Sequence, residues 1–320
     1  MPRHVLMVFM KRILTIILSF TTIFLGFTAQ GEELTLPHGD FELMRQTGGG
    51  TVSEVVNPLT VKLEDGRLVD LAGLDYPDLD FYDPGDLAVT AQEILNDFLK
   101  GQKVTIYQTA TTAKGRVNRM NHHIAHLVRN KDGVWVQGML LSLGVARVRT
   151  TKYNPEMATQ MLALENKARQ EKAGLWAMEK YAILTPEQAK EHIGSYQVVE
   201  GVVNSVSMHR NKLYLNFGHN WKDDFTIGIS AFDERDFKQH KFEPRRWSGK
   251  KIRVRGWVES YNGPYIEIDH PERVETLFEQ SDGDNNDAPK GSALPDRVAA
   301  PDKASNREKN SGNALPKLND

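Results

Sequence analysis

Two apolar runs early in the chain constrain the fold more than any other feature. Apolar residues recur through residues 55–63, as in a strand interrupted at Asn57-Pro58, and again through residues 68–75. The turn Glu64-Asp65-Gly66 separates the two runs. This pattern predicts strands of a sheet joined by a tight turn. The second run ends on Asp75, and Asp78 follows in a loop that also contains a proline. Two carboxylates therefore stand where a strand passes into a loop, a common place for chemistry.

The spacing of residues 52–176 resembles the staphylococcal nuclease (thermonuclease) family. The resemblance covers the opening hairpin, the exit of the first helix, a glycine-containing run in the middle and an E-x-x-A-R-x-x-x-x-G-L-W close. It implies a mainly β protein with helices (α+β), built on an oligonucleotide/oligosaccharide-binding (OB) barrel. The matching residues include Val56, Thr60, Val61, Leu63, Leu71, Gly73, Asp75, Pro77, Leu99, Gly101, Val104, Gly133, Gly144, Ala146, Val148, Glu165, Ala168, Arg169, Gly174, Leu175 and Trp176.

The resemblance also implies where an active site would lie. The two calcium ligands of the family fall on Leu59 and Asp75, and the glutamate that orients or activates water falls on Asp78. The two arginines that clamp the phosphate fall on Asp70 and His122. Leucine offers no oxygen to a cation that takes six or more oxygen ligands. An aspartate repels a phosphodiester, and a largely neutral imidazole cannot make the bidentate fork of a guanidinium.

These replacements predict a nuclease fold that has lost its nuclease activity. This mode of phosphodiester cleavage depends on a cation and on positive groups that stabilise developing negative charge, each worth about 10²-fold or more. No cofactor is then expected. The alternative is a divergent calcium-dependent phosphodiesterase that uses Asp75 and Asp78, with a further ligand recruited from the acidic loop of residues 75–86.

Three histidines near one strand suggest a second place for a metal. His122 and His123 are adjacent, and His126 follows three residues later. On a strand, His122 and His126 would lie on one face and His123 on the other, so the shared face offers two ligands and no identified third. We therefore favour the interpretation that they are polar groups on a partly exposed strand. The same preference applies to the acidic loop, whose spacing matches no calcium-loop template.

The first 31 residues have the form of a secretory signal peptide. Basic residues precede the apolar run of residues 13–27, and Ala29-Gln30-Gly31 offers a cleavage site of small residues. About 15 apolar residues fall short of the roughly 20 needed to span a membrane, so an uncleaved anchor is the less favoured alternative. We therefore expect a secreted or periplasmic bacterial protein, with cleavage after Gly31 and no stable membrane span afterwards. The chain has no cysteine, which is compatible with that location.

A second strand-rich domain follows the first. We expect the nuclease-like domain at residues 32–180, a linker helix at 181–192 and an OB-like barrel of five strands at 193–278. Residues 279–320 contain almost no large apolar side chains, which predicts a disordered tail.

Cations and aromatic rings gather in this second domain, although the whole chain has a net charge of −2. Alternation predicts that Arg253, Arg255 and Trp257 point outward together, as an exposed stripe that could bind a polyanion. An inert, solvated surface is the alternative. The full set of candidate binding residues is Tyr214, Arg245, Arg246, Lys250, Lys251, Arg253, Arg255 and Trp257.

Three functions remain open from the sequence. The first is a secreted, catalytically silent protein that binds nucleic acid or another anionic polymer. The second is the divergent calcium-dependent nuclease. The third is a structural envelope protein that binds a protein partner.

Overall fold

A computed structural model describes residues 36–80, 82–220 and 222–278. The predicted signal peptide and the predicted tail lie outside these residues. Both domains described below belong to one compact unit. Within the described part of the chain, no helix combines the length and the hydropathy required to cross a membrane.

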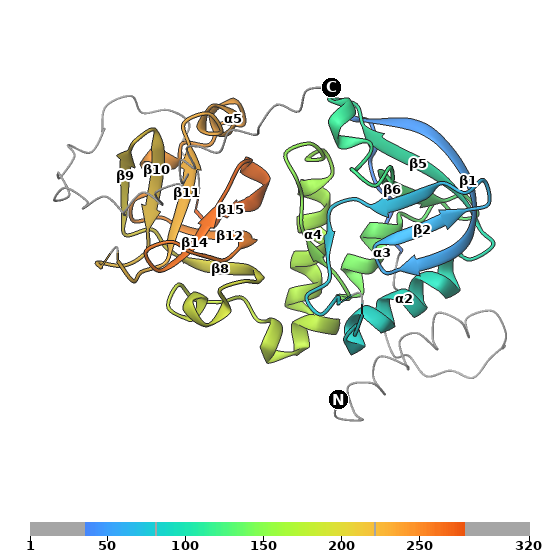
Figure 1. Cartoon of the computed structure of the whole chain (residues 1–320), viewed down its shortest axis with the longest axis horizontal. Coiled ribbons are helices and arrows are strands. Elements are labelled where there is room, and N and C mark those ends of the chain that lie inside the picture. The colour runs from blue at the N-terminus through green and yellow to red at the C-terminus, as the bar shows by residue number, and fades with distance from the viewer. Residues whose placement is uncertain (1–35, 81, 221, 279–320) are drawn as a thin grey trace, which may run out of the picture. The chain divides into compact units, whose positions relative to one another are not determined.

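Five strands close the first barrel in the order β1-β2-β3-β6-β5 (Figure 1). Neighbouring strands are antiparallel except β3 and β6, which run parallel. The closed barrel confirms the predicted fold class and leaves this sheet without a free edge. The strands are β1 (Met44–Asn57), β2 (Thr60–Leu63), β3 (Leu68–Leu71), β5 (Lys103–Thr109) and β6 (His123–Arg129).

The run of residues 55–63 forms a hairpin rather than one interrupted strand. β1 ends at Asn57, which pairs with Thr60 at the start of β2. The Asn57 side-chain oxygen accepts a hydrogen bond from the backbone N–H of Leu59 at 2.8 Å. Such a bond from an asparagine to the backbone two residues later stabilises a tight turn.

The first half of β1 has no counterpart among the predicted elements. Residues Met44 to Thr51 pair with β5, although Gly48, Gly49 and Gly50 interrupt the apolar pattern. A Cβ on Gly49 would lie 2.5 Å from the carbonyl oxygen of Val104, so β1 and β5 approach too closely for a larger residue there. The glycines are therefore explained by backbone packing.

Three helices cover the first barrel: α2 (Asp86–Leu99), α3 (Val136–Ser142) and α4 (Ala158–Gln170). The buried face of α2 presents Leu87, Ala91, Leu95 and Leu99 to the core, as its helical spacing predicts. Between the barrel and α4, β4 (Leu74–Asp75) pairs with β7 (Arg147–Val148). This short antiparallel pair sets Asp75 directly opposite Arg147.

The second domain shares two strand pairings with the first, but its strands form two sheets, in the orders β13-β14-β11-β10-β9 and β15-β12-β8, and do not close into one five-stranded barrel. We call this open arrangement the second barrel. β8 pairs antiparallel with β12, β11 pairs parallel with β14, and α5 (Glu234–Gln239) lies between β11 and β12 in sequence. Likewise, β1 pairs antiparallel with β5, and β3 pairs parallel with β6. The strands are β8 (Tyr196–Val202), β9 (Ser205–His209), β10 (Lys212–Asn216), β11 (Thr226–Ser230), β12 (Lys251–Trp257), β13 (Glu259–Ser260), β14 (Pro264–Glu267) and β15 (Val274–Thr276).

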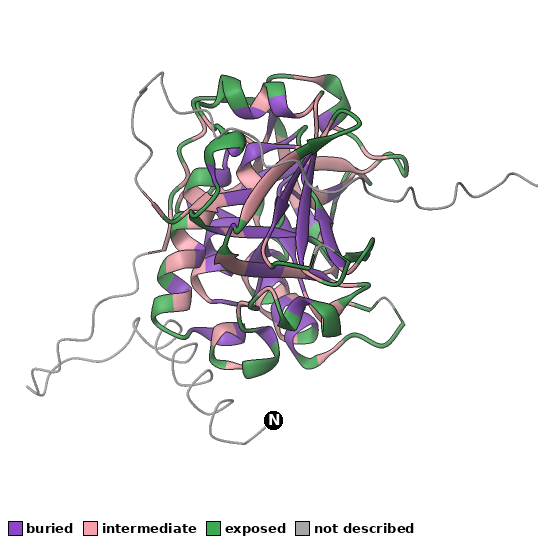
Figure 2. Ribbon diagram, turned by 90° about the vertical axis from the view of Figure 1, so that its left-hand side faces the viewer, coloured by how far each residue is buried: buried purple, intermediate pink, exposed green. Residues whose placement is uncertain are grey.

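Each barrel has its own hydrophobic core. Trp135, Leu140 and Leu141 lie in the first core, and Phe225, Phe237 and Ile252 lie in the second. The buried strands and the exposed loops around them are distinguished in Figure 2. Between the cores, the predicted linker helix is a short 3-10 helix, Gln188–His192.

Candidate functional site

Asp75, the residue that the resemblance implies as a retained calcium ligand, binds arginine in the structure. The Arg147 guanidinium donates two hydrogen bonds to Asp75 Oδ2, from Nη2 at 2.8 Å and from Nε at 3.1 Å. Arg149 Nη1 lies 3.6 Å from the other carboxylate oxygen. Asp75 is only 8% exposed. Both oxygens that a cation would use therefore face permanently charged guanidinium groups.

Arg147 is held in place from a second direction. Its Nη2 also donates to the backbone carbonyl of Tyr196 at 2.7 Å, at the first residue of β8. The ring of Tyr196 lies beneath Arg149, with 5.1 Å between the guanidinium carbon and the ring centroid. The arginine that neutralises Asp75 thus also joins the first barrel to the second.

Asp70 and His122, which stand where the resemblance places the two family arginines, bind each other. His122 Nδ1 lies 3.0 Å from Asp70 Oδ1. The same carboxylate accepts hydrogen bonds from Thr60 Oγ1 at 2.8 Å and from Asn118 Nδ2 at 2.7 Å. Leu59, the other replaced ligand, packs against the hydrophobic core. Neither Asp70 nor His122 can therefore bind a phosphate as an arginine would.

Asp78 caps a helix. Its two carboxylate oxygens accept hydrogen bonds from the backbone N–H groups of Leu87 at 3.0 Å and Ala88 at 3.1 Å. These N–H groups belong to the first turn of α2, where the helix has no acceptors of its own. Asp86 is the first residue of α2. The side chain that caps α2 is therefore Asp78, from the preceding loop.

The acidic loop and the histidines do not assemble a metal centre in the described residues, where no group of three suitable side chains occurs. Asp80 accepts backbone hydrogen bonds from Tyr82 and Asp83, which hold the pKa of its carboxyl below the usual value. His126 is 2% exposed, and its Nδ1 lies 3.2 Å from Trp135 Nε1. Burial lowers the pKa of His126 to about 3, so the ring is neutral at pH 7.

The prediction that Arg253 and Arg255 belong to an exposed stripe on β12 is wrong. Alternation does place Arg253 and Arg255 on one face, but that face packs against α4 of the first barrel. Arg255 is 1% exposed and its guanidinium binds Glu165 of α4 at 3.0 and 3.1 Å. Its Nη2 also donates to Glu275 at 2.5 Å. Arg255 is therefore unavailable to a polyanion.

Arg253 extends the same cluster of ion pairs. Its guanidinium binds Glu200 at 2.6 Å and Glu275 at 3.0 Å. Arg169 of α4 lies 3.3 Å from Glu275. Burial by itself raises the pKa of Glu275, but the neighbouring guanidinium groups hold that pKa below its ordinary value. We call Glu165, Arg169, Arg253, Arg255 and Glu275 the interbarrel ion cluster.

Most of the remaining basic run is neutralised by acids of the same barrel. Lys251 binds Glu200 at 2.6 Å, Arg245 binds Glu234 at 2.5 Å, and Arg246 binds Glu243 at 2.8 Å. Lys250 lies over the ring of Phe278. Tyr214 is buried, and Trp257 is 48% exposed. Of the two aromatic candidates, Tyr214 and Trp257, only Trp257 has a large solvent-exposed surface.

Sequence reasoning missed the residues that occupy this region. Arg147 lies between Ala146 and Val148, two matched positions of the family pattern, and that pattern leaves the residue between them free. Its role depends on the cross-strand pairing of Asp75 with Arg147, which joins segments 72 residues apart. A prediction that the strand of residues 68–75 pairs with the segment of residues 144–148 would have brought Asp75 and Arg147 together.

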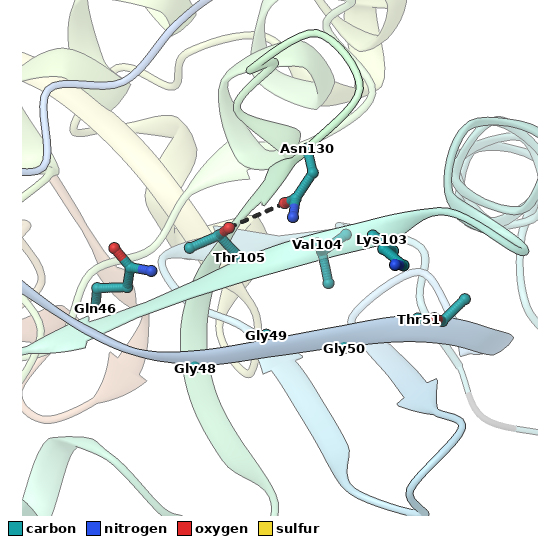
Figure 3. Close-up of a pocket in the computed structure, with 9 residues that line it drawn as sticks. All are labelled: Gln46, Gly48, Gly49, Gly50, Thr51, Lys103, Val104, Thr105 and Asn130. Carbon is teal, nitrogen blue, oxygen red and sulfur yellow. Dashed lines mark hydrogen bonds between the residues drawn. The ribbon is translucent and has the colours of Figure 1, made fainter.

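A hollow of about 320 Å³ lies on the outside of the first barrel between β1 and β5 (Figure 3). Gly48, Gly49 and Gly50 line it on one side, and the Thr105 hydroxyl donates to Asn130 Oδ1 at 2.9 Å on the other. None of the predicted site residues lines this hollow.

These features define a closed five-stranded barrel in which Arg147 and Arg149 face the carboxylate of Asp75. A family model described as staphylococcal nuclease homologue matches residues 69–178. The chain thus contains a staphylococcal nuclease-like domain, a class of domain associated with the binding or hydrolysis of nucleic acid. A comparison with curated proteins finds no match to the chain.

Proposed function

We propose that the protein is a catalytically silent, nuclease-like protein that binds nucleic acid. The observation that carries this proposal is the pair of hydrogen bonds from Arg147 to Asp75, at 2.8 and 3.1 Å. A divalent cation would have to displace a buried, permanently charged guanidinium from the one family ligand that the sequence retains. Breaking such a buried pair typically costs about 3–5 kcal/mol.

The other family positions support the loss of catalysis. Asp70 and His122 bind each other, and Asp78 caps α2. None of these side chains is available for the role that the resemblance implies for its position. The calcium-dependent alternative needs Asp75 and Asp78 as metal ligands or bases, and both carboxylates already accept hydrogen bonds from the protein.

Local charge supports nucleic acid as the ligand. Residues 98–155 contain a single acid, Asp132, although the whole chain has a net charge of −2. Arg129 pairs with that acid at 2.5 Å. A local excess of this size attracts polyanions independently of the global charge. The cations of the segment are Lys100, Lys103, Lys114, Arg116, Arg119, Arg129, Lys131, Arg147, Arg149 and Lys152. Arg147 and Arg149 pair with Asp75 and Lys152 with Asp233, so the excess lies in residues 100–131.

We include export in the proposal. The basic, apolar and small-residue pattern of residues 1–31 supports secretion or a periplasmic location, and fractionation of cells that express the full chain tests it. Recovery of the protein only from the cytosol would contradict this part of the proposal.

The binding test uses the purified protein and fluorescently labelled single-stranded and duplex DNA in a titration at low salt. We expect binding whose logarithmic affinity falls linearly with the logarithm of salt concentration, because phosphate contacts release counterions. An acidic protein of similar size is the control for nonspecific anisotropy changes. No binding at low salt, where electrostatic attraction is strongest, would remove nucleic acid as the ligand.

A further inference from the structure

The hollow between β1 and β5 lies where an outward-facing position of β1 has no side chain. The strand pairing sets Thr51 opposite Lys103 and Gly49 opposite Thr105. Val104, between the two β5 residues, is buried in the core, so Lys103 and Thr105 point away from the core. Gly49 contributes no side chain opposite Thr105, and the hollow of about 320 Å³ opens there (Figure 3).

The side chains around this hollow offer hydrogen-bond donors. Figure 3 shows Gln46, Asn130 and Lys103 spread along it. Thr105 Oγ1 donates to Asn130 Oδ1 at 2.9 Å, which engages the amide oxygen and leaves the N–H groups of Asn130 Nδ2 as donors. The ammonium group of Lys103 adds further N–H groups and a positive charge. The hollow therefore suits a ligand that consists of acceptor atoms.

No acid offsets the positive charge beside the hollow. Lys103 is exposed and forms no ion pair within the described part of the chain. The backbone N–H of Asn130 donates to Lys103 O at 2.9 Å, and the exposed Lys131 follows Asn130 directly. The sequence has no acid from residue 98 to residue 131, and the next acid, Asp132, pairs with an arginine. Such a group of donors and ammonium groups attracts anions.

We propose that this hollow binds one phosphate group of a nucleic-acid backbone, with Lys103 and Asn130 as donors to its oxygens. This inference rests on the proposed function, that the protein binds nucleic acid, and it names the surface that the backbone contacts. Lysine binds phosphate as a point charge, and side-chain amides are among the usual contacts of backbone phosphates. The glycine at position 49 removes a side chain that would keep a phosphate away from the sheet.

A nucleic-acid backbone fits this surface better than a small metabolite or an acidic peptide does. Small-molecule sites enclose about 300–1,000 Å³, so a hollow near the lower limit of that range takes a single group of a longer ligand. Lys131 supplies further positive charge for a neighbouring phosphate of the same strand. Val104 is the one apolar side chain among the lining residues and it is buried, so a peptide would find no apolar centre to pack on.

The test titrates the full-length protein with fluorescently labelled single-stranded DNA at several salt concentrations. For Lys103→Gln we expect about 3- to 5-fold weaker binding and a salt slope smaller by about 0.7, the value for one phosphate contact on a single strand. Asn130→Asp keeps an oxygen that accepts from Thr105 and puts a negative charge in the hollow. For this variant we expect at least about 10-fold weaker binding.

Matched controls change the same residue types elsewhere. Lys62→Gln removes an exposed lysine of β2, and Asn211→Asp adds a charge to the exposed turn between β9 and β10. Both controls alter the net charge as the hollow variants do, and we expect both to bind as the wild type does. Thermal unfolding verifies that all four variants are folded.

Acetylation of lysines, read by mass spectrometry, gives a second measurement that needs no substitution. Bound DNA should lower the acetylation rate of Lys103 by about 3-fold or more, while that of Lys62 stays the same. Inorganic phosphate and poly-glutamate at the same ionic strength are the comparison ligands. Protection of Lys103 by either one equal to that by DNA would identify a free anion or an acidic peptide as the ligand and overturn the assignment.

The outcomes separate the two proposals. If the wild type binds DNA and the Lys103 and Asn130 variants bind equally well, the hollow is wrong and the proposed function stands. If the control pair weakens binding as much as the hollow pair, the effect is one of general charge and the hollow is also overturned. If the wild type itself does not bind, the proposed function falls first.

Discussion

At the scale of single residues, Asp75 shows how a residue type can match the family pattern while its surroundings differ from those that the resemblance implies. The carboxylate is still present, but its oxygens bind Arg147 and Arg149. The sequence alone predicted that Asp75 was the surviving metal ligand, because the residue type is unchanged. Its partner could not be predicted, since the partner lies on a strand far away in sequence and no spacing rule links the two.

Replacing Asp75 with asparagine should therefore lower stability. Asp75→Asn leaves the buried Arg147 without its counter-charge, and we expect a loss of about 3–5 kcal/mol in the free energy of unfolding. Urea denaturation followed by circular dichroism measures this loss. Asp80→Asn serves as the control, because Asp80 is exposed and bonds only to backbone groups of its own loop, so it should change stability little.

His126 gives the protein a pH-dependent stability. Its pKa is about 3 in the folded protein, compared with 6.5 for an ordinary histidine, because the ring is buried. As the pH falls below 6.5, His126 binds a proton in the unfolded chain but not in the folded chain. The free energy of unfolding therefore decreases down to about pH 3. Between pH 6.5 and pH 4 this single group should cost about 3 kcal/mol.

The measurement compares the urea midpoints of the wild type and His126→Gln at pH 7 and pH 4. We expect the variant to lose distinctly less stability than the wild type over this interval, whatever its stability at pH 7. Equal losses in the two proteins would show that His126 does not drive the acid sensitivity.

At the scale of elements, β12 shows why its pattern was predictable and its role was not. Alternation correctly placed Arg253 and Arg255 on one face. A strand pattern does not reveal whether its outer face meets solvent or another domain. Here α4 covers that face, and the interbarrel ion cluster replaces the expected binding stripe.

Breaking the interbarrel ion cluster on one side should be costly. Arg255→Met leaves Glu165 buried without its main partner, and we expect a loss of about 3–5 kcal/mol. The double variant Glu165→Leu with Arg255→Met removes both charges and should recover much of that loss. Urea denaturation of the two single variants and the double variant measures the coupling. Additive losses would contradict a direct buried pair.

The first turn of α2 offers a smaller test. Asp78→Ala removes the two hydrogen bonds to Leu87 and Ala88, and we expect a loss of about 1 kcal/mol, typical of a helix cap. Thermal unfolding with Asp83→Ala as the control measures it. Substitution of a catalytic base would leave stability nearly unchanged, so an unchanged melting temperature would contradict the capping role.

At the scale of the whole molecule, the sequence predicted the barrel class well because regular strand spacing and the family pattern agree. It missed the start of β1, since glycines carry no apolar period, and it missed the packing of the second barrel on α4. The function that emerges rests on that packing as much as on the replaced residues. The second barrel contributes the Tyr196 carbonyl that helps hold Arg147 beside Asp75.

The most direct test of this account is digestion of heat-denatured DNA by the full-length protein, with calcium and with a chelator in its place. Because Arg147 and Arg149 face both carboxylate oxygens of Asp75, we predict the same intact DNA under both conditions, with a calcium-dependent nuclease as the positive control. Calcium-dependent cleavage that disappears in Asp75→Asn, while a folded Asp78→Ala variant also loses activity, would contradict the account.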